Sequence, residues 1–143
     1  MQNMEAKKVM YGSDGEIWID GDYMAEVESC KGTVTYDKLE VKMVKHKGRG
    51  YKSTGWTGKG SVKLHHVDSY FVKKYAAAAK EGRQVPVTII SKLSDKDAVG
   101  EERVAFKNCL FDAFDLVNWE VGKLGEDSYN FTFDDYEILD TAG

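Results

Sequence analysis

Proline and cysteine are scarce in this chain, and long apolar runs are missing altogether. Its 143 residues include one proline, Pro86, and two cysteines, Cys30 and Cys109. A membrane-spanning helix needs roughly 20 consecutive apolar residues, and no segment comes close. The N-terminus has no apolar core of the kind that a secretory signal requires. We therefore expect a protein that folds in the cytoplasm, has no membrane partner and forms a single domain over residues 1–143, with a flexible N-terminal segment at about 1–11.

The shortage of cysteine and histidine limits the chemistry that the chain can carry. Both cysteines lie in strand-like segments, and neither belongs to a Cys-x-x-Cys motif. Such cysteines in the cytoplasm are usually reduced and behave as small apolar side chains, so we favour two thiols over a disulfide. His65 and His66 are adjacent, which points them to opposite faces of a strand. We therefore expect no metal and no other cofactor.

Catalytic motifs are also missing. The glycine-rich stretch at residues 45–60 departs twice from a phosphate-binding loop, because Ser53 stands where a glycine is needed and Gly60 where Ser or Thr is needed. Paired acids occur at 101–102 and at 134–135, but no nucleophile or convergent histidine accompanies them. The sequence therefore predicts that the protein is not an enzyme.

What the chain does have is a two-residue hydrophobic period. The segment at 15–20 alternates, and the Asp20-Gly21 dipeptide predicts a tight hairpin onto Tyr23–Cys30. A change of parity near Asp37-Lys38 predicts a bulge or turn there. Further apolar positions alternate at Val62/Leu64, Val85/Val87/Ile89, Val104/Phe106, Phe114/Leu116, Trp119/Val121 and Tyr129/Phe131/Phe133.

One segment has a helical pattern instead. Residues 68–82 contain a candidate N-cap at Asp68 or Ser69, an alanine run, and Gly82 where a glycine that ends a helix belongs. The apolar positions of this segment follow a helical spacing, which predicts one amphipathic helix packed against a sheet. The predicted fold class is therefore mainly β: an antiparallel β-sandwich or barrel of about seven strands with one flanking α-helix at about 68–82.

The stretch at residues 45–60 differs from its surroundings. It holds five glycines and is strongly basic, with Tyr51 and Trp56 as its large apolar residues. Such a stretch cannot bury much of itself, so we expect an extended, exposed basic loop at about 45–60. Binding of nucleic acid is one interpretation of a basic loop with aromatics, but the net charge of −4 weighs against it.

Charge is segregated along the chain. Residues 38–63 hold eight Lys or Arg against one acid, whereas residues 112–140 hold nine acids against one base. Two copies could attract each other through these regions, and a head-to-tail contact of that kind closes into rings or propagates as a filament. The alternative is that the two regions pair within one monomer or are simply solvated.

Several short motifs occur in an order that resembles a known family. They are Gly12-x-x-Gly15-x-x-x-x-Asp20-Gly21-x-x-Met24-Ala25-x-Val27, Glu40-Val41, Gly50-x-Lys52-x-x-Gly55-x-x-Gly58-x-Gly60, Val67-Asp68-Ser69-x-Phe71-Val72, Glu101-Glu102-Arg103-Val104, Phe111-Asp112 and Phe131-Thr132-Phe133-Asp134-Asp135-Tyr136. In this order, from about residue 12 to 138, the chain resembles the tail tube proteins of contractile phages and phage-like particles, particularly the PBSX-type group. Where that pattern has Gly-Thr-Glu-Arg-Val, this chain has Gly100-Glu101-Glu102-Arg103-Val104.

The resemblance implies a structural function. Subunits of this family form hexameric rings that stack into the inner tube of a contractile tail or bacteriocin-like particle, and sheath contraction drives that conduit through a target envelope. The implied partners are further copies of the chain and the sheath, baseplate and terminator proteins, with DNA only as possible transit cargo. The protein would be cytoplasmic during assembly and then part of the released particle.

The resemblance also suggests which residues mediate assembly. We expect inter-subunit contacts from both charged regions, at Lys45, Lys47, Arg49, Tyr51, Lys52, Trp56, Lys59, Asp112, Asp115, Asp134 and Asp135. The alternative function is that of a monomeric β-fold binding module, whose basic loop at 45–60 would bind an acidic partner or nucleic acid.

Overall fold

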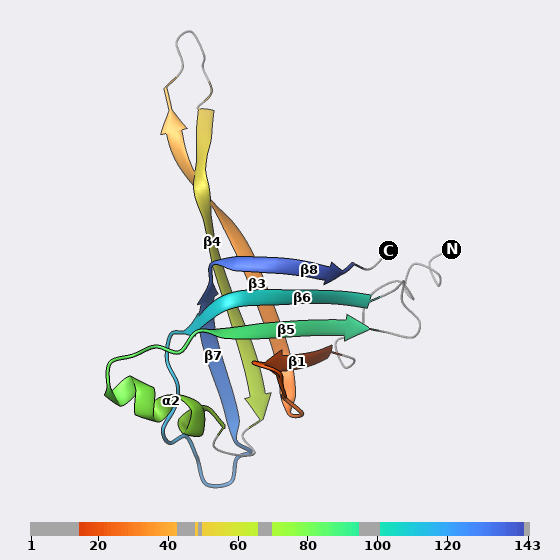
Figure 1. The fold of residues 1–143 in the computed structure, drawn as a ribbon, viewed down its shortest axis with the longest axis vertical. Coiled ribbons are helices and arrows are strands. Elements are labelled where there is room, and N and C mark those ends of the chain that lie inside the picture. The colour runs from red at the N-terminus through yellow and green to blue at the C-terminus, as the bar shows by residue number, and fades with distance from the viewer. Residues whose placement is uncertain (1–14, 43–47, 49, 66–69, 95–100, 142–143) are drawn as a thin grey trace.

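The computed structural model describes residues 15–42, 48, 50–65, 70–94 and 101–141 (Figure 1). These residues form eight strands and one helix. In chain order the elements are β1 (Gly15–Ile19), β2 (Asp22–Tyr23), β3 (Val27–Val41), β4 (Gly50–His65), α2 (Tyr70–Lys80), β5 (Val87–Ser94), β6 (Glu101–Phe111), β7 (Glu126–Phe133) and β8 (Asp135–Asp140). The predicted fold class, mainly β with one flanking helix, is confirmed. The predicted N-terminal segment at 1–11 lies outside the described residues.

The strands form two crossing layers. The strand order is β2-β1-β5-β6-β7-β4-β3, β8 pairs with β6, and every pairing is antiparallel. Strands β1, β5, β6 and β8 run across the direction of β3, β4 and β7 (Figure 1). Strand β6 joins the layers, because it pairs with β5 and β8 over most of its length and with β7 only at Leu110 and Phe111.

Local turn chemistry predicted the position of two features. The hairpin after Asp20-Gly21 is shorter than predicted, however, because its second strand is only β2, and residues 27–30 belong to β3, which pairs with β4. Asp20 and Gly21, which connect β1 to β2, have φ angles of 50° and 84°. Two successive positive φ angles belong to the type I′ turn, whose twist matches that of a hairpin. The predicted irregularity near Asp37 is also present, since Asp37 pairs with Gly55 whereas Lys38 pairs with Ser53. The extra residue of this bulge is Thr54, on β4.

The core lies between the layers and is rich in aromatic side chains. Phe71 of the helix stacks on Tyr129 of β7, with ring centroids 4.0 Å apart. Three glycines on β3 and β4 lie directly beneath aromatic rings, so that a Cβ at Gly32, Gly58 or Gly60 would overlap Phe106, Phe133 or Phe131 respectively. Gly32 therefore lets the Phe106 ring of the other layer pack onto the β3 backbone. Gly58 and Gly60 let the rings of the neighbouring strand β7 lie across β4. Within the described segments, no helix is long and apolar enough to cross a bilayer.

The helix ends where the sequence predicts. Gly82 has φ 77°, its N–H donates to the Ala79 carbonyl at 3.0 Å, and the Arg83 N–H donates to the Ala78 carbonyl at 2.9 Å. These two bonds form the Schellman motif that commonly ends helices at glycine. The N-cap candidates Asp68 and Ser69 lie outside the described residues.

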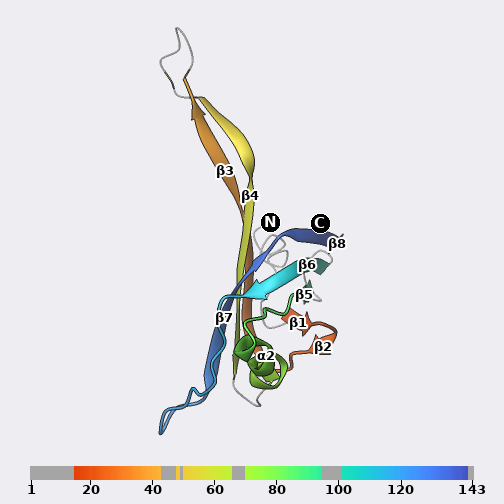
Figure 2. The same ribbon diagram turned by 60° about the vertical axis from the view of Figure 1, so that its left-hand side comes forward.

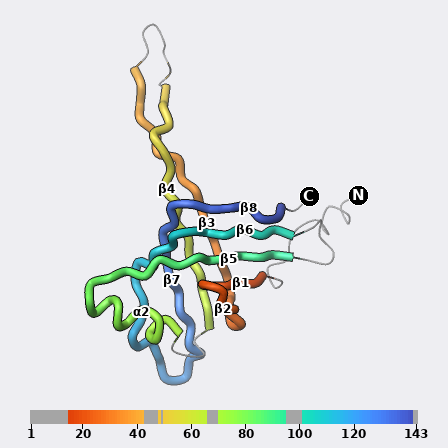
Figure 3. Tube along the Cα trace, in the orientation of Figure 1, coloured from red at the N-terminus to blue at the C-terminus, as the bar shows by residue number. Residues whose placement is uncertain are grey.

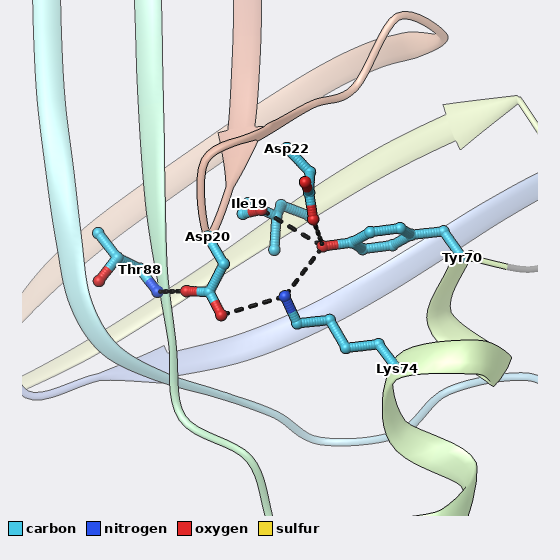
Figure 4. Close-up of polar contacts among 6 residues, drawn as sticks. All are labelled: Ile19, Asp20, Asp22, Tyr70, Lys74 and Thr88. Carbon is cyan, nitrogen blue, oxygen red and sulfur yellow. Dashed lines mark hydrogen bonds and ion pairs between the residues drawn. The ribbon is translucent and has the colours of Figure 1, made fainter.

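A polar cluster fastens the helix to the β1–β2 turn (Figure 4). Lys74 Nζ lies 3.1 Å from Asp20 Oδ2 and donates to the Tyr70 hydroxyl at 3.2 Å. The Tyr70 hydroxyl in turn lies 3.0 Å from Asp22 Oδ2, and the other oxygen of Asp20 accepts the Thr88 N–H at 2.9 Å. The helix, the turn and the start of β5 are therefore held together by one set of contacts.

Two predictions about secondary structure are wrong in part. The extended loop predicted at 45–60 is a strand from Gly50 onward, because residues 50–60 continue β4 and pair with β3. The alternating pairs Phe114/Leu116 and Trp119/Val121 do not form strands, and residues 112–125 are an irregular connection between β6 and β7. Alternation alone does not make a strand where no neighbouring strand lies within hydrogen-bonding reach.

Candidate assembly surfaces

The structure describes eight of the eleven predicted assembly residues and places them in three groups. Lys45, Lys47 and Arg49 lie outside the described residues. The other eight are all exposed. They are Tyr51, Lys52, Trp56 and Lys59 on β4, Asp112 and Asp115 in the β6–β7 connection, and Asp134 and Asp135 at the β7–β8 junction.

Tyr51, Lys52 and Trp56 of the first group lie on a two-stranded arm, defined here as residues 35–41 of β3 and 50–57 of β4. Lys59 lies beyond the arm, where β4 pairs with β7. Strand β7 pairs with β4 only from Gly58 onward, so the arm strands pair with each other and project from the body (Figure 2). The arm carries exposed lysines, including Lys38 and Lys52, and large apolar side chains with exposed fractions of 69% at Tyr36 and 59% at Leu39. The arm is therefore an exposed, largely apolar strand pair rather than a loop, and its two lysines are accompanied by the acids Asp37 and Glu40.

Trp56 anchors the arm to the body. Its ring centroid lies 6.0 Å from that of Phe133 and 5.5 Å from that of Tyr136. A side-chain hydrogen bond from Thr57 Oγ1 to Asp37 Oδ2, at 3.2 Å, joins the two arm strands next to the bulge. Trp56 therefore has a contact within the monomer as well as an exposed surface.

The acids of the β7–β8 junction also have partners within the monomer. Asp134 Oδ1 accepts a hydrogen bond from Asn108 Nδ2 at 2.8 Å, and Asp135 Oδ1 accepts the Tyr136 N–H at 2.9 Å. Asn108 has φ 54°, at the point where β6 bends from one layer toward the other. These bonds stabilise the change of direction between β7 and β8, so the case for an assembly role is weaker at Asp134 and Asp135 than on the arm.

Some residues of the basic and acidic regions pair with each other within one molecule. Strands β4 and β7 are neighbours, and Lys63 Nζ lies 3.1 Å from Glu126 Oε1. This hydrogen bond and the attraction between the charges raise the pKa of Lys63 and lower that of Glu126. The basic and acidic regions therefore pair at the base of β4, while the arm carries its lysines away from the acidic region.

The β6–β7 connection forms the end of the molecule opposite the arm (Figures 2 and 3). It exposes five large apolar side chains: Leu116 at 67%, Val117 at 73%, Trp119 at 76%, Val121 at 87% and Leu124 at 90%. Sequence reasoning missed this surface, because the alternation of these residues indicated half-buried strands. Their proximity to Asp112, Asp115 and Glu120 was the available signal that the segment lies in water.

A third exposed apolar surface lies on β8. This strand pairs with β6, and no other described strand is paired with it. All six of its residues are exposed, including Tyr136, Ile138 and Leu139. An unpaired strand edge with apolar side chains is a ready site for pairing with another chain.

The described residues offer little that resembles a catalytic centre. A groove of about 410 Å³ between β1, β3 and β5 is lined by Cys30, Ser91 and Lys92, among others. Both cysteines are free, and burial raises the pKa of Cys30 to about 11 and that of Cys109 to about 12. Both are therefore neutral thiols at physiological pH, which are poor nucleophiles. Among the described residues no cluster of three or more His, Cys, Asp or Glu is placed to hold a metal ion.

Comparison with known proteins gives a consistent family and fold. The family model described as "Phage tail tube protein" matches residues 2–140. The chain is 28% identical over 137 residues to the phage-like element PBSX protein XkdM of Bacillus subtilis (strain 168), covering 94% of this chain and 93% of that protein.

Two solved structures share the fold at low sequence identity. One is from the tube-terminating cap of the anti-feeding prophage, with a TM-score of 0.70, 10% identity and coverage of 93% of this chain and 92% of that one. The other is from the sheath–tube complex of an extracellular contractile injection system, PVC, in the extended state. It has a TM-score of 0.69, 7% identity and coverage of 99% and 98%.

Proposed function

The chain belongs to the phage tail tube protein family, and from that membership we propose that its copies assemble as hexameric rings that stack into the inner tube of a contractile tail or bacteriocin-like particle. Its role in the tail is structural. The tube would be the conduit that sheath contraction drives through a target envelope. We propose sheath, baseplate and terminator proteins as its further partners, and DNA as a possible transit cargo.

One observation supports self-assembly above the others: the monomer exposes large apolar side chains on three separate surfaces. These are the arm, the β6–β7 connection and β8. Monomeric soluble proteins rarely expose several such surfaces, which usually mark sites of protein contact. Copies that covered these surfaces for one another would remove the apolar area from water.

Strand pairing is the proposed contact within a ring. In the layer formed by β1, β5, β6 and β8, strand β8 lies at one edge and β1 with the short β2 lies at the other. Addition of β8 from one copy to the β1–β2 edge of the next would continue the sheet around a ring. A closed ring leaves no free edge, which accounts for an edge strand as exposed as β8.

We further propose that the protein works without catalysis or a cofactor and that the arm lysines contribute to assembly. Membership of a tail tube family and the neutral, buried thiols support the first statement. The exposed positions of Lys38 and Lys52 on a free arm support the second. Assembly would take place in the cytoplasm and be followed by incorporation into the particle. The alternative of a monomeric binding module gains no support from the family or the fold.

Electron microscopy of concentrated purified protein tests the proposal. The wild-type chain is expected to form rings or tubes of uniform diameter. A Lys38→Glu/Lys52→Glu variant is expected to polymerise less while keeping a folded monomer, because both side chains are exposed. Lys80→Glu is the matched control, since Lys80 is an exposed lysine on the helix. A wild-type protein that stays monomeric at every concentration would contradict the proposal.

A further inference from the structure

The inner faces of the two layers continue beyond the core, where they are exposed among the described residues. Residues directly paired across strands share a face, so Tyr36 lies on the same face as Trp56. Two positions further along β4, Gly58 lies under the ring of Phe133. The face that carries Tyr36 and Trp56 is therefore the core-facing side of the β3–β4 layer, extended onto the arm.

The same holds for the other layer. Tyr136 pairs with Phe106, and Ile138 pairs with Val104, so both β8 side chains share the face that Phe106 turns into the core. The rings of Tyr136 and Trp56 touch, and beyond this contact the arm and β8 point in different directions (Figure 1). We call the corner between them the wedge, lined by Val34, Tyr36, Trp56, Tyr136 and Ile138.

The wedge is apolar core surface that none of the described strands or helices covers. Tyr36 is 69% exposed and Ile138 57%, although both lie on faces that are buried elsewhere in the sandwich. The charged residue Glu137 of β8 lies on the opposite face, where it pairs with Lys107 at 3.1 Å. The wedge is therefore an exposed apolar surface that other apolar side chains can pack against.

The chain carries a matching protrusion that cannot reach its own wedge. The apolar side chains of the β6–β7 connection, from Leu116 to Leu124, lie at the end of the molecule opposite the arm (Figures 1 and 2). Only a second copy can bring this protrusion to the wedge. A contact between different surfaces of identical chains is heterologous and can repeat from copy to copy.

Charge favours the same pairing. Exposed Lys38 lies on the face of the wedge, two positions from Tyr36, while Lys52 and Lys59 lie on the opposite face of the same two strands. The connection carries exposed acids at Asp112 and Asp115. Complementary charge around an apolar contact orients the partners and disfavours like-to-like association. Two connections brought together would instead place the acids Asp112 and Asp115 near their own copies.

We propose that the β6–β7 connection of one copy docks into the wedge of a second copy, and that this contact joins successive rings along the tube axis. The inference rests on the proposed function. It attributes the axial contact to apolar side chains. The acidic and basic residues around them only orient the two copies. It also explains why the connection keeps five large apolar residues in water when the subunit is alone.

Cysteine cross-linking tests the contact directly. One preparation carries Tyr36→Cys and a second carries Trp119→Cys, and the two are mixed under assembly conditions with a mild oxidant. The native thiols give a low background, since burial raises the pKa of both Cys30 and Cys109. The mixture is expected to form a disulfide-linked dimer, whereas Tyr36→Cys mixed with Lys80→Cys, on the exposed helix surface, is expected to form almost none.

A loss-of-contact variant gives the second readout. Trp119→Ala/Leu124→Ser is expected to fold normally, because both side chains are largely exposed, and to give single rings in place of tubes. The single variant Trp119→Phe, which keeps a large apolar ring at this position, is expected to form stacked rings. Normal tubes from the double variant, or equal cross-linking to residues 119 and 80, would overturn the inference. Either result leaves the ring-and-tube proposal intact, because that proposal fails only if the wild-type chain forms no rings or tubes.

The chain's own N-terminal segment is the competing occupant of the wedge. Deletion of residues 1–11 should leave the cross-link between positions 36 and 119 unchanged if the second copy fills the wedge. If the cross-link appears only after the deletion, the wedge belongs to the N-terminal segment and the inference is wrong.

Discussion

The indole of Trp56 packs edge-on against the ring of Tyr136, with ring centroids 5.5 Å apart and ring planes 76° from each other. One residue belongs to the root of the arm and the other to the edge strand β8. The pair therefore joins two of the three surfaces proposed for assembly. The bulge opposite Asp37 lies next to this contact, so the direction of the arm depends on a short stretch of strand with little other packing.

Removal of the indole should loosen the arm. Trp56→Ala is expected to lower the free energy of unfolding by about 1–2 kcal/mol, because a half-exposed ring with two aromatic contacts is lost. Urea unfolding measures the stability, and amide hydrogen exchange over residues 33–41 and 50–57 measures the arm. Tyr51→Ala is the control, and a surface substitution of this kind should stay within about 0.5 kcal/mol. Equal effects of the two variants would contradict the anchoring role of Trp56.

The glycine beneath Phe131 should not tolerate a side chain. A Cβ at Gly60 would overlap the Phe131 ring and come within 2.7 Å of the Lys31 carbonyl oxygen, a backbone atom that cannot rotate away. Gly60→Ala is expected to destabilise the fold by about 1–3 kcal/mol through overpacking. Thermal or urea unfolding checks this, with Ser61→Ala on the neighbouring position as the control. A Gly60→Ala protein as stable as the control would show that the ring can move aside.

The cluster that fastens the helix should contribute modestly. Lys74→Met removes the contacts to Asp20 and to the Tyr70 hydroxyl while keeping an aliphatic side chain. The expected loss is about 0.5–1.5 kcal/mol, the range of a hydrogen bond or a partly exposed ion pair. Lys73→Met, at an exposed position on the same helix, is the matched control. Equal stability of the two variants, measured by urea unfolding, would show that the contacts in Figure 4 contribute nothing net.

Stability should fall at alkaline pH. Burial raises the pKa of Cys30 from 9.0 to about 11 and that of Cys109 from 9.0 to about 12. Above pH 9 the unfolded chain loses thiol protons that the folded chain keeps, so unfolding becomes more favourable as pH rises toward the folded-state values. Burial likewise raises the pKa of Tyr70 and Tyr75, which adds to the loss at higher pH.

Urea midpoints between pH 7 and pH 11 measure this dependence. Cys109→Ala is expected to lower stability at pH 7, because it leaves space in the core, and to flatten the decline above pH 9. An unchanged slope in the variant would show that Cys109 does not contribute. Only a group whose pKa differs between the folded and the unfolded chain makes stability depend on pH.

Predictions that depended on a few neighbouring residues were reliable. The Asp20-Gly21 turn follows from the ease with which these residues adopt positive φ angles, and the end of the helix at Gly82 follows from the same property. The position of the bulge near Asp37 coincides with a change of parity on β3, although the inserted residue, Thr54, lies on the partner strand β4. Mainly β architecture followed from the repetition of a two-residue period along the chain.

Predictions that depended on distant residues were less reliable. The glycine-rich stretch from Gly50 reads as a loop because glycine has low strand propensity, yet Gly58 and Gly60 are in a strand because Phe133 and Phe131 occupy the space above them. The alternating residues around Trp119 read as a strand, yet they lie exposed because no neighbouring strand pairs with them. Both errors arise because local propensity ignores what packs opposite.

The sequence by itself determined the period of the strands, the two glycine turns, the single amphipathic helix and the separation of basic from acidic residues. Each of these is a property of residues close together in the chain, and backbone sterics or charge decides it locally. Only the tertiary structure decided that the arm and the β6–β7 connection lie at opposite ends. It also decided that the core faces carrying Trp56 and Tyr136 extend beyond the part that other described residues cover. Exposure depends on which distant strand lies across from a side chain, and that is a property of the whole sheet.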